Sequence, residues 1–344
     1  MTHVVVTGAA GFIGSGFVDL LLAERRDVET VTGIDKLGYA GDIRNLADAL
    51  VDDRFRFVEG DILDNRLVTS LMRDADEVAH FAAESMVDRS VLDPQSFLNA
   101  NVLGTGSVLQ AARDTCVRRF LHISTPEVYG QRMETAAHEG DAFVPRNVYA
   151  ASKAAAEMVV SAYVHTFGVP VVITRGSSAI GPRQHPEKVT PRLITSALQD
   201  QPLPVYGDGS ALRDFVHVSD LNRANDLVLQ RGEVGLAYNV ATGEVRTIRD
   251  LALGIIDRLA KPRSLVAFTD DRVAHDRHYW MSGSRLAALG WSPRYNFEQA
   301  LDDTVRWYSD NRDWWLGKVE SADFQGYLVR SADARARHKA RGGA

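Results

Sequence analysis

The sequence contains almost no cysteine. Cys116 is the only one in 344 residues, which excludes an internal disulfide and the class of small secreted proteins that disulfides hold together. It lies between a helical pattern and a predicted strand, where we interpret it as a packing residue rather than a nucleophile. A chain that cannot form internal disulfides fits a reducing compartment or a protein that is indifferent to redox state, and we expect a cytoplasmic protein by default.

Positive net charge and long apolar runs are absent as well. The formal charge is -6 at pH 7, which argues against nucleic acid or an anionic membrane as a bulk partner. The sequence contains no run of about 18 apolar residues, which is the pattern that predicts a membrane span. The remaining composition is ordinary, with 45% hydrophobic and 24% charged residues, and the chain is long enough for one large or two modest domains. We expect no nucleic-acid partner and no membrane partner.

A glycine-rich turn stands near the N-terminus. Residues 3–7 (HVVVT) predict a strand, which leads directly into Gly8, Gly11 and Gly14, and residues 12–22 predict a helix. In this context the first glycine permits a tight turn, the second lets the backbone approach a pyrophosphate, and the third lets the helix pack closely on the sheet. The helix N-terminus then faces the phosphates. A ligand-free turn is the alternative.

The next predicted strand ends in a carboxylate. Residues 28–35 (VETVTGID) end in Asp35, 21 residues after Gly14. A carboxylate at this position accepts hydrogen bonds from a ribose diol and repels a 2′-phosphate, so NAD is favoured over NADP. The adjacent Lys36 weakens that preference.

Strands and helices alternate as far as residue 175. Further strands are predicted at 55–62, 77–85, 118–125 and 170–175, and helices at 95–113 and 149–168. This pattern predicts an α/β fold of the Rossmann type, a doubly wound parallel sheet that binds ligands at the carboxyl ends of its strands. Asp61 and Ile62 there could flank an adenine, or only close a turn. The small Ala82 and Ala83 would let a cofactor lie against backbone.

The segment 124–153 holds the candidate chemistry. Tyr149 and Lys153 are four residues apart and share a helix face. An ammonium beside a phenol lowers the pKa of the phenol toward neutrality, which gives a base for a hydroxyl proton. Thr125 and Glu127 come within reach if the segment begins at a strand end and finishes on a helix. A surface lysine on an amphipathic helix is the alternative reading.

The C-terminal half has a different texture. Residues 181–192 (GPRQHPEKVTPR) predict a loop, residues 205–221 predict a hairpin that presents Arg213, and Arg272, His275 and Arg277 form a second basic cluster. Guanidinium groups match the oxygens of a diphosphate. Arginines of a solvated loop that binds no ligand would give the same sequence pattern and are the alternative.

These patterns give expected domain boundaries. We expect an NAD-binding Rossmann domain at 1–174 and a smaller C-terminal α/β substrate-binding lobe mainly at 175–330. Residues of about 213–242 should return to the Rossmann sheet, and 331–344 should be a polar, frayed tail.

The motifs together resemble the extended short-chain dehydrogenase/reductase superfamily, most closely its dTDP-glucose 4,6-dehydratase family. The matching pieces include VTGAAGFIGS, DKLGYAGDIRNL, HFAAESMVDRS, HISTPEVYG, YAASKAAAE, GPRQHPEK, PVYGDGSALRDFVHVSD and HDRHY, from residue 3 to about 316. The resemblance implies a tightly held NAD, a nucleotide-diphosphate sugar as substrate, and a homodimer formed through two helices of each subunit, for which residues 95–113 and 149–168 are the candidates.

The resemblance also implies roles for single residues. Tyr149 is the base, Lys153 holds the nicotinamide ribose and tunes Tyr149, Thr125 contacts the substrate hydroxyl, and Glu127 removes a sugar proton. The cofactor-binding residues are Gly8, Gly11, Phe12, Ile13, Gly14, Asp35, Lys36, Asp61, Ile62, Ala82, Ala83, Glu84, Asn101, Ser124, Tyr149 and Lys153. The substrate-binding residues are Ser85, Thr125, Pro126, Glu127, Ser178, Lys188, Arg192, Tyr206, Arg213, Asn239, Arg272, His275 and Arg277. No metal is expected.

Three positions depart from the family pattern. The family usually reads Ser-Thr-Asp-Glu where this chain has Ser-Thr-Pro-Glu, so Pro126 replaces the aspartic acid that protonates the departing C6 hydroxyl. Residues 177–180 read SSAI where the family usually has an Asn-Asn-Tyr segment, and Met86 stands in place of a common histidine. General-acid help is typically worth about 10²–10⁴-fold in rate, and a pocket that loses hydrogen-bonding groups changes its discrimination between substrates.

Three hypotheses follow. The first is an NAD-dependent nucleotide-sugar 4,6-dehydratase that acts through a 4-keto sugar with an altered acid. The second is an epimerase, acting at C4 or at a carbon next to the ketone, or a uronate decarboxylase with the same Thr125, Tyr149 and Lys153 centre. The third is a catalytically silent NAD-binding protein, which the intact centre disfavours.

Overall fold

A seven-stranded parallel sheet forms the larger part of the computed structural model, which describes residues 2–271 and 275–340. Its strand order is β11 (Ala237–Val240), β7 (Val171–Gly176), β5 (Arg119–Ser124), β4 (Glu77–His80), β1 (Thr2–Thr7), β2 (Val28–Asp35) and β3 (Phe55–Glu59). Every neighbouring pair runs parallel. The predicted fold class is therefore confirmed, and the order reverses between β1 and β4, where such sheets bind their ligands.

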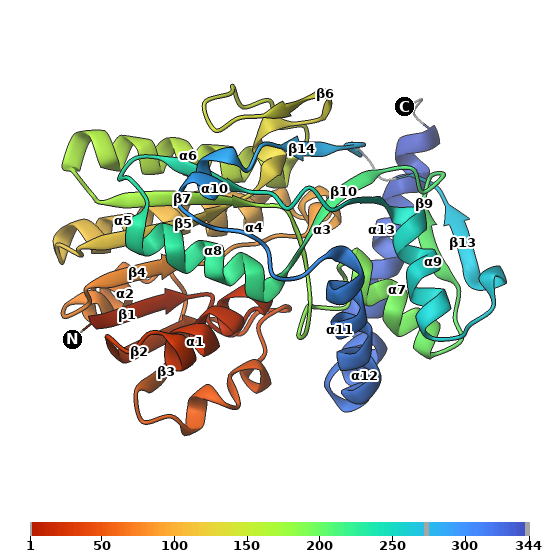
Figure 1. Cartoon of the computed structure of the whole chain (residues 1–344), viewed down its shortest axis with the longest axis horizontal. Helices are drawn as coiled ribbons and strands as arrows, with labels where there is room; N and C mark the ends of the chain where they lie inside the picture. The colour runs from red at the N-terminus through yellow and green to blue at the C-terminus, as the bar shows by residue number, and fades with distance from the viewer. Residues whose placement is uncertain (1, 272–274, 341–344) are drawn as a thin grey trace.

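Helices cover both faces of this sheet (Figure 1). On one face, α1 (Phe12–Glu24) and α8 (Val218–Arg231) bury a core with residues such as Phe17, Leu121 and Val228. On the other, α2 (Asn65–Met72), α5 (Thr105–Asp114) and α6 (Val148–Phe167) bury a second core around Phe120. The strands read as continuous apolar runs because side chains on both faces are buried.

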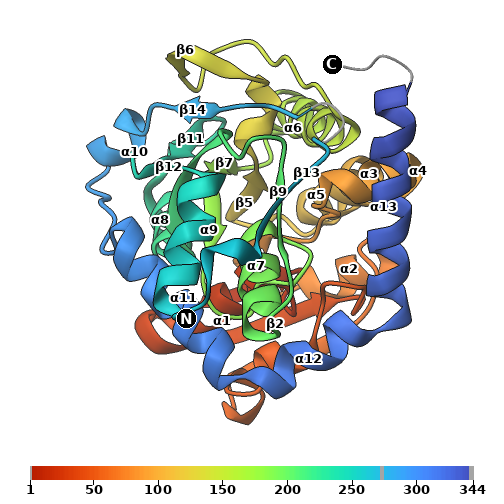
Figure 2. The same ribbon diagram turned by 90° about the vertical axis from the view of Figure 1, so that its right-hand side faces the viewer.

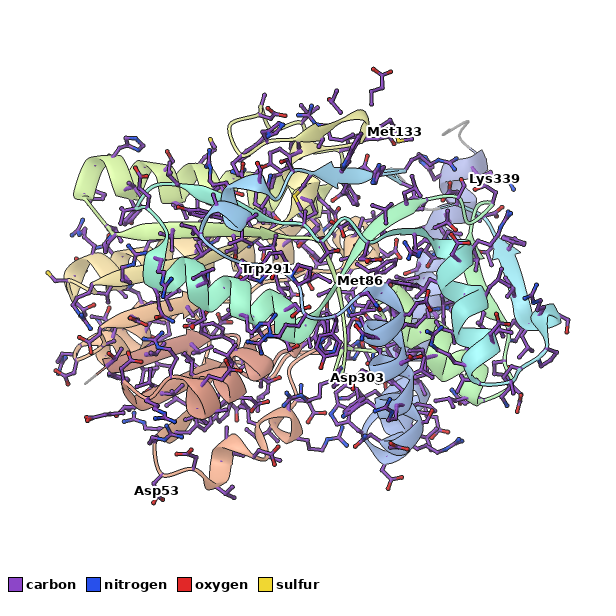
Figure 3. All side chains as sticks on the ribbon, viewed as in Figure 1. Asp53, Met86, Met133, Trp291, Asp303 and Lys339 are labelled. Atoms are coloured by element: carbon purple, nitrogen blue, oxygen red, sulfur yellow. The ribbon has the colours of Figure 1, made fainter. Side chains whose placement is uncertain are left out.

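The smaller lobe lies beyond the carboxyl ends of the strands. Its core packs α7 (Val189–Leu198), α9 (Ile248–Arg258), α11 (Phe297–Asp310) and α12 (Arg312–Glu320). Three small sheets accompany it: β12 (Val245–Thr247), β10 (Leu212–His217) and β8 (Ser178–Ile180); β13 (Val266–Thr269) and β9 (Leu203–Tyr206); β14 (Tyr279–Met281) and β6 (Arg132–Ala137). Figure 3 places Met86, a buried side chain, between the large sheet and this lobe.

The remaining elements connect these layers. They are α3 (Val87–Leu92), α4 (Pro94–Phe97), α10 (Ser284–Ala288), α13 (Ala322–Ala340), the π-helical η3 (Leu98–Gly104) and the short 3-10 turns η1 (Ile43–Leu46), η2 (Ala49–Val51), η4 (Pro126–Tyr129) and η5 (Arg263–Leu265). The predicted helix at 95–113 is thus one continuous helical stretch with a π-helical middle.

Three expectations differ from the structure. Residues 205–221 do not form a hairpin, because β9 pairs with β13 while β10 pairs with β8 and β12. Cys116 is exposed, at φ 56, rather than packed. The tail expected to fray from residue 331 continues α13 to Ala340 (Figure 2). In the range 213–242, β11 joins the large sheet, whereas β10 lies outside it.

Candidate functional site

Three adjoining cavities form one groove along the carboxyl ends of the strands. The cofactor cavity, about 110 Å³, lies at Gly8, Asp35 and Ala82. The central cavity, about 340 Å³, lies at Thr125, Tyr149 and Lys188. The outer cavity, about 160 Å³, lies at Tyr206 and Arg192. Neighbouring cavities share lining residues, among them Gly8 and Gly11 on one side and Glu127 and Arg213 on the other.

The glycine turn has no space for side chains. Gly8 adopts φ +69, and a Cβ there would lie 2.6 Å from the Ala82 nitrogen. A Cβ on Gly14 would lie 2.1 Å from the Gly8 carbonyl oxygen. The positive φ disfavours any other residue at position 8, and the close approach brings α1 against the turn. The backbone of this turn therefore faces the groove directly, as a pyrophosphate site requires.

Asp35 is fixed by the backbone around it. Its two carboxylate oxygens accept hydrogen bonds from the Ala10 nitrogen (3.0 Å) and the Leu37 nitrogen (2.8 Å). Burial raises the pKa of Asp35, and these backbone hydrogen bonds oppose the shift. Lys36 lies beside it and pairs with Glu84 at 3.5 Å. These residues fit NAD: the carboxylate lines the cofactor cavity, where a ribose diol can donate to it.

Most predicted cofactor residues lie on this groove. Asn101 is the exception among the described residues, because it is fully buried in η3. Its side chain accepts from the Glu84 nitrogen (2.8 Å) and donates to the Glu84 carbonyl (2.9 Å) and to Ser152 (2.8 Å). Asn101 thus ties the loop after β4 to helix α6 rather than facing the cavity.

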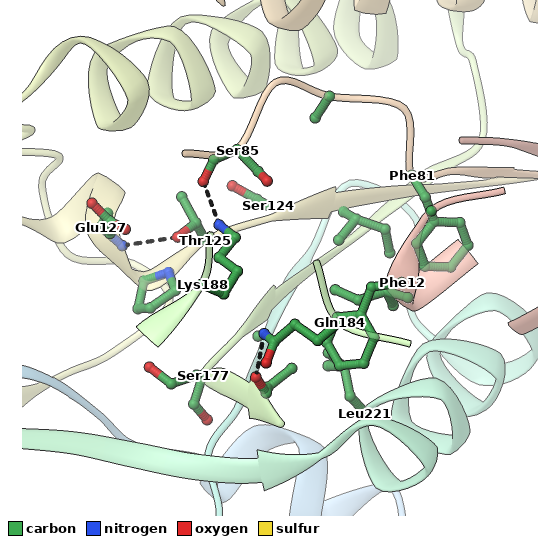
Figure 4. A pocket seen from close by; sticks show the side chains of 18 of the residues that line it. Phe12, Phe81, Ser85, Ser124, Thr125, Glu127, Ser177, Gln184, Lys188 and Leu221 are labelled. Atoms are coloured by element: carbon green, nitrogen blue, oxygen red, sulfur yellow. Dashed lines mark hydrogen bonds between the residues drawn. The ribbon is translucent and has the colours of Figure 1, made fainter. Parts of the chain in front are cut away.

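Thr125, Pro126 and Glu127 form the turn after β5. Thr125 caps η4 and accepts from the Glu127 nitrogen at 3.4 Å, with Pro126 as the first residue of the turn. Proline suits that position because its nitrogen needs no hydrogen bond there. All three residues line the central cavity, and Figure 4 shows Thr125 and Glu127 on its wall.

Asn147 connects this turn to the helix that bears Tyr149. Its Oδ1 caps α6 by accepting from the Ala150 nitrogen (2.8 Å), and its Nδ2 donates to Glu127 Oε2 (3.1 Å). Sequence analysis missed Asn147, although an asparagine immediately before a predicted helix is a recognisable N-cap.

Tyr149 and Lys153 differ from the expected pair. Burial raises the pKa of Tyr149 above its usual value and Glu127 raises it further, while a hydrogen bond with Thr125 lowers it. The Lys153 Nζ donates to the Ile123 carbonyl at 2.6 Å, and burial lowers its pKa to about 8. The expectation that Lys153 brings the phenol toward neutrality is therefore wrong for the protein without ligand.

A buried ion pair supports the floor of the site. Arg175 donates to both oxygens of Glu157, at 2.9 and 2.6 Å, and Glu157 also accepts from Ser124. Tyr129 extends this network by donating to Asn239 Oδ1 at 2.8 Å and contacting Arg175. Asn239 is fully buried in that network. It was predicted to bind substrate, but the structure does not bring it to the groove.

The substrate side is lined by cations. Lys188 Nζ donates to the Ser85 carbonyl at 2.6 Å, as Figure 4 shows. Arg213 reaches both the central and outer cavities and contacts His275 Nε2 at 3.2 Å. The other predicted substrate residues on these walls are Ser178, Arg192 and Tyr206.

Arg277, a predicted phosphate ligand, is not on these walls. Arg277 is turned to the surface, where it contacts Ser210 at 3.0 Å and Asp208 at 3.4 Å. Arg272 lies outside the described residues.

Tyr279 and Asp276 were not predicted. Tyr279 lines the central cavity on β14, a strand that packs against η4, and the Arg213 guanidinium lies 4.6 Å from its ring centroid. Asp276 is fully buried behind it. Burial raises the pKa of Asp276. Arg146, whose guanidinium lies 3.1 Å from the carboxylate, and the Tyr279 phenol both oppose this upward shift. Only the folded chain brings these residues to Glu127, so no local pattern could have revealed them.

Neither a membrane span nor a metal centre is found in the part of the chain that the structure describes. Across residues 2–271 and 275–340, every helix is too short or too polar to cross a membrane. In the same residues no group of three or more His, Cys, Asp or Glu side chains is placed to hold a metal ion.

Comparison with known proteins gives close relatives. The dTDP-glucose 4,6-dehydratase of Actinoplanes sp. is 45% identical over 317 residues, which are 91% of this chain and 99% of that protein. The dTDP-glucose 4,6-dehydratase structure from Streptomyces venezuelae, with NAD bound, has a TM-score of 0.91 at 42% identity and covers 92% of this chain and 100% of that one. The UDP-glucuronic acid 4-epimerase structure from Bacillus cereus, with UDP-glucuronic acid and NAD, has a TM-score of 0.85 at 29% identity and covers 90% and 99%.

These relatives confirm the predicted family, fold class and cofactor. The family described as GDP-mannose 4,6 dehydratase matches residues 5–304. With that match and relatives of more than 40% identity over nearly the whole length, the chain belongs to this family of NAD-dependent nucleotide-sugar dehydratases and epimerases.

Proposed function

We propose that the protein is a nucleotide-sugar 4,6-dehydratase that works through a 4-keto sugar and carries its acid on a different segment from its base. The observation that carries the proposal is Glu127. It lines the central cavity beside Thr125 and Tyr149, and Asn147 holds it there. A 4-epimerase has no step that uses such a carboxylate, whereas dehydration needs a base for the C5 proton.

Oxidation at C4 needs a proton acceptor and a hydride acceptor. Tyr149 takes the proton of the C4 hydroxyl, and Thr125 holds that hydroxyl by a hydrogen bond. NAD, when bound, would supply the hydride acceptor and donor of the reaction, together with the positive charge of its oxidised ring. Such a charge near Tyr149 would counter the burial that raises the pKa of the phenol. The Lys153 ammonium would add to this effect if it bound the cofactor ribose in place of the Ile123 carbonyl.

Elimination at C5 and C6 needs a base and an acid. Glu127 removes the C5 proton, which the neighbouring ketone acidifies, and the C6 hydroxyl leaves as water after it accepts a proton. Pro126 has no proton to give. We assign this proton to Tyr279, because its phenol lines the same cavity on a strand packed against η4. Asp276, whose pKa burial raises, lies behind Tyr279 and can return a proton to it.

The test is the mass of the product. Incubation of the purified enzyme with a panel of thymidine and uridine diphosphate sugars should give a product that has lost one water and keeps a ketone. Tyr279→Phe should retain exchange of the C5 proton with solvent deuterium but lose elimination by about 10²-fold or more. A product of unchanged mass from the native enzyme would overturn the proposal. Unchanged elimination in Tyr279→Phe would overturn the assignment of the acid only.

A second candidate function is epimerisation or decarboxylation. Pro126 favours it, because neither reaction requires a proton donor at that position. The likeness to a UDP-glucuronic acid 4-epimerase supports the same idea. An epimerase would give a product of unchanged mass, and a uronate decarboxylase a product that has lost carbon dioxide, so the same mass spectrum separates the three reactions.

A homodimer is part of the proposal. The helical stretch of η3 and α5 packs beside α6, and this face carries Leu98 (41% exposed), Leu103 (60%) and Met158 (56%). Exposed large apolar side chains on helices that pack side by side favour pairing with a second copy. Light scattering should give twice the mass of the chain, and Leu103→Glu should reduce it to the monomer. A cytoplasmic location goes with nucleotide-sugar substrates and is also proposed.

A further inference from the structure

Helix α13 lies wholly outside the residues that the family match covers. The match ends at residue 304, whereas α13 spans Ala322–Ala340. It runs along one side of the molecule past α3, as Figure 2 shows. The family match therefore assigns no role to this helix.

The first half of α13 is anchored beside the cofactor cavity. Asp323 pairs with Arg89 at 2.7 Å. Arg89 also binds both oxygens of Glu187, a residue of the outer cavity, and its guanidinium lies 3.9 Å from the ring centroid of Tyr39, which lines the cofactor cavity. Tyr327 donates to Asp88 at 3.4 Å. This half therefore braces residues from two cavities at once.

The second half contacts Tyr206, a residue that lines the outer cavity. The Arg335 guanidinium lies 4.8 Å from the ring centroid of Tyr206, and its Nη1 donates to the Tyr206 hydroxyl at 3.3 Å. The same hydroxyl donates to Asp88 at 3.5 Å. Tyr206 is thus held between an arginine of α13 and the carboxylate that also holds Tyr327.

The outer cavity has the lining expected for the nucleotide end of the substrate. Cationic side chains of Lys188, Arg192 and Arg213 face it, next to the apolar Pro204 and Ile248. Cations suit a diphosphate, and a flat ring beside apolar side chains suits a nucleobase. The Tyr206 ring forms one wall, so its orientation decides the shape of this end.

From these contacts we infer that α13 is a substrate-positioning helix, in which Arg335 fixes the Tyr206 ring against the nucleoside diphosphate part of the substrate. Arg335 touches no reacting atom. It acts through Tyr206 and therefore sets affinity rather than the rate of the chemical step. The inference rests on the proposed function, because it assumes a nucleotide-sugar substrate.

The test compares two arginines of the same helix. Arg335→Ala should weaken the binding of thymidine or uridine diphosphate, measured by titration calorimetry, by about three- to five-fold, the size of one partly exposed cation–aromatic contact. KM for the nucleotide sugar should rise by the same factor, with kcat within about two-fold. Arg330→Ala is the matched control, since Arg330 is exposed and lines none of the three cavities; it should change neither quantity. Arg335→Lys should restore part of the affinity.

A double-mutant cycle separates positioning from general stabilisation. In a Tyr206→Leu background, Arg335→Ala should have no further effect on diphosphate binding, because the ring that it holds is gone. An undiminished effect there would overturn the inference, as would a fall in kcat without a change in KM. If the native protein binds neither diphosphate, the proposed function has failed. If it binds one and Arg335→Ala binds it equally well, only this inference has failed.

Discussion

The cofactor end of the groove is built from backbone, and the substrate end is built from side chains. At the cofactor end, Gly8 and Gly14 leave no room for a Cβ, and backbone nitrogens fix both oxygens of Asp35. At the substrate end, Lys188, Arg213 and Tyr279 come from separate loops and strands. A backbone site binds the part of a ligand that is common to a whole family, whereas a side-chain site can change by single substitutions. The departures at Met86, Pro126 and Ser178 all fall at the substrate end.

The largest effect is expected where the two ends meet. Tyr149→Phe removes the only proton acceptor that we assign to oxidation at C4, so kcat should fall by about 10²–10⁴-fold. The affinity for NAD, measured by fluorescence titration, should stay within about three-fold, because the phenol ring remains. Residual turnover near the native rate would show that another base acts. Tyr149 would then not be the residue that connects the cofactor end of the groove with the substrate end.

The next effect tests how adjustable the substrate end is. Pro126→Asp places a carboxyl group beside Glu127, and we expect faster elimination by up to about 10²-fold with a native nucleotide sugar, measured as release of the unsaturated or 6-deoxy product. Pro126→Asn is the control for the loss of proline without a proton donor. If both variants are equally active, the site does not use an acid at this position.

A smaller effect tests the backbone end. Gly8→Ala should lower the affinity for NAD by at least about ten-fold, because the Cβ meets the Ala82 backbone and φ +69 is strained. Lys36→Ala, which removes an exposed side chain from the same cavity, should cost less than about three-fold. Equal losses in the two variants would break the contrast, since a side chain would then matter there as much as the backbone.

The smallest effect concerns stability and pH. Burial lowers the pKa of Lys153 to about 8, below its value in the unfolded chain, so between this pKa and about 10.5 the unfolded chain binds more protons. Stability should therefore rise with pH in this window, by at most about 1.4 kcal/mol per unit from this group. Lys153→Met should remove that rise in denaturant titrations at pH 7, 8, 9 and 10. An identical slope in both proteins would show that Lys153 does not titrate there.

Residues defined by neighbours in the chain were predictable, and residues defined by the fold were not. Gly8 follows β1 and Asp35 ends β2, while Tyr149 and Lys153 are four residues apart on α6, so local spacing indicates where each lies. Asn239 was expected at the groove, but strand β11 pairs beside β7 and buries it below the cavity floor.

The same difference explains two other outcomes. The prediction of a hairpin at 205–221 was wrong, because the Gly207–Gly209 turn separates strands that belong to two different sheets. For the protein without ligand the pKa of Tyr149 was predicted in the wrong direction, since spacing places Lys153 on the same helix face but does not reveal that its ammonium is held by the Ile123 carbonyl.

The position of Cys116 has a practical consequence. It is the only thiol of the chain, it is exposed, and it precedes the amino end of β5, whereas the groove lies at the carboxyl end of that strand. A maleimide dye would therefore attach at a single site on the opposite edge of the sheet. Because φ is 56 there, Cys116→Gly should give an unlabelled reference protein without strain. Energy transfer from that dye could follow assembly or ligand entry while the groove itself stays unmodified.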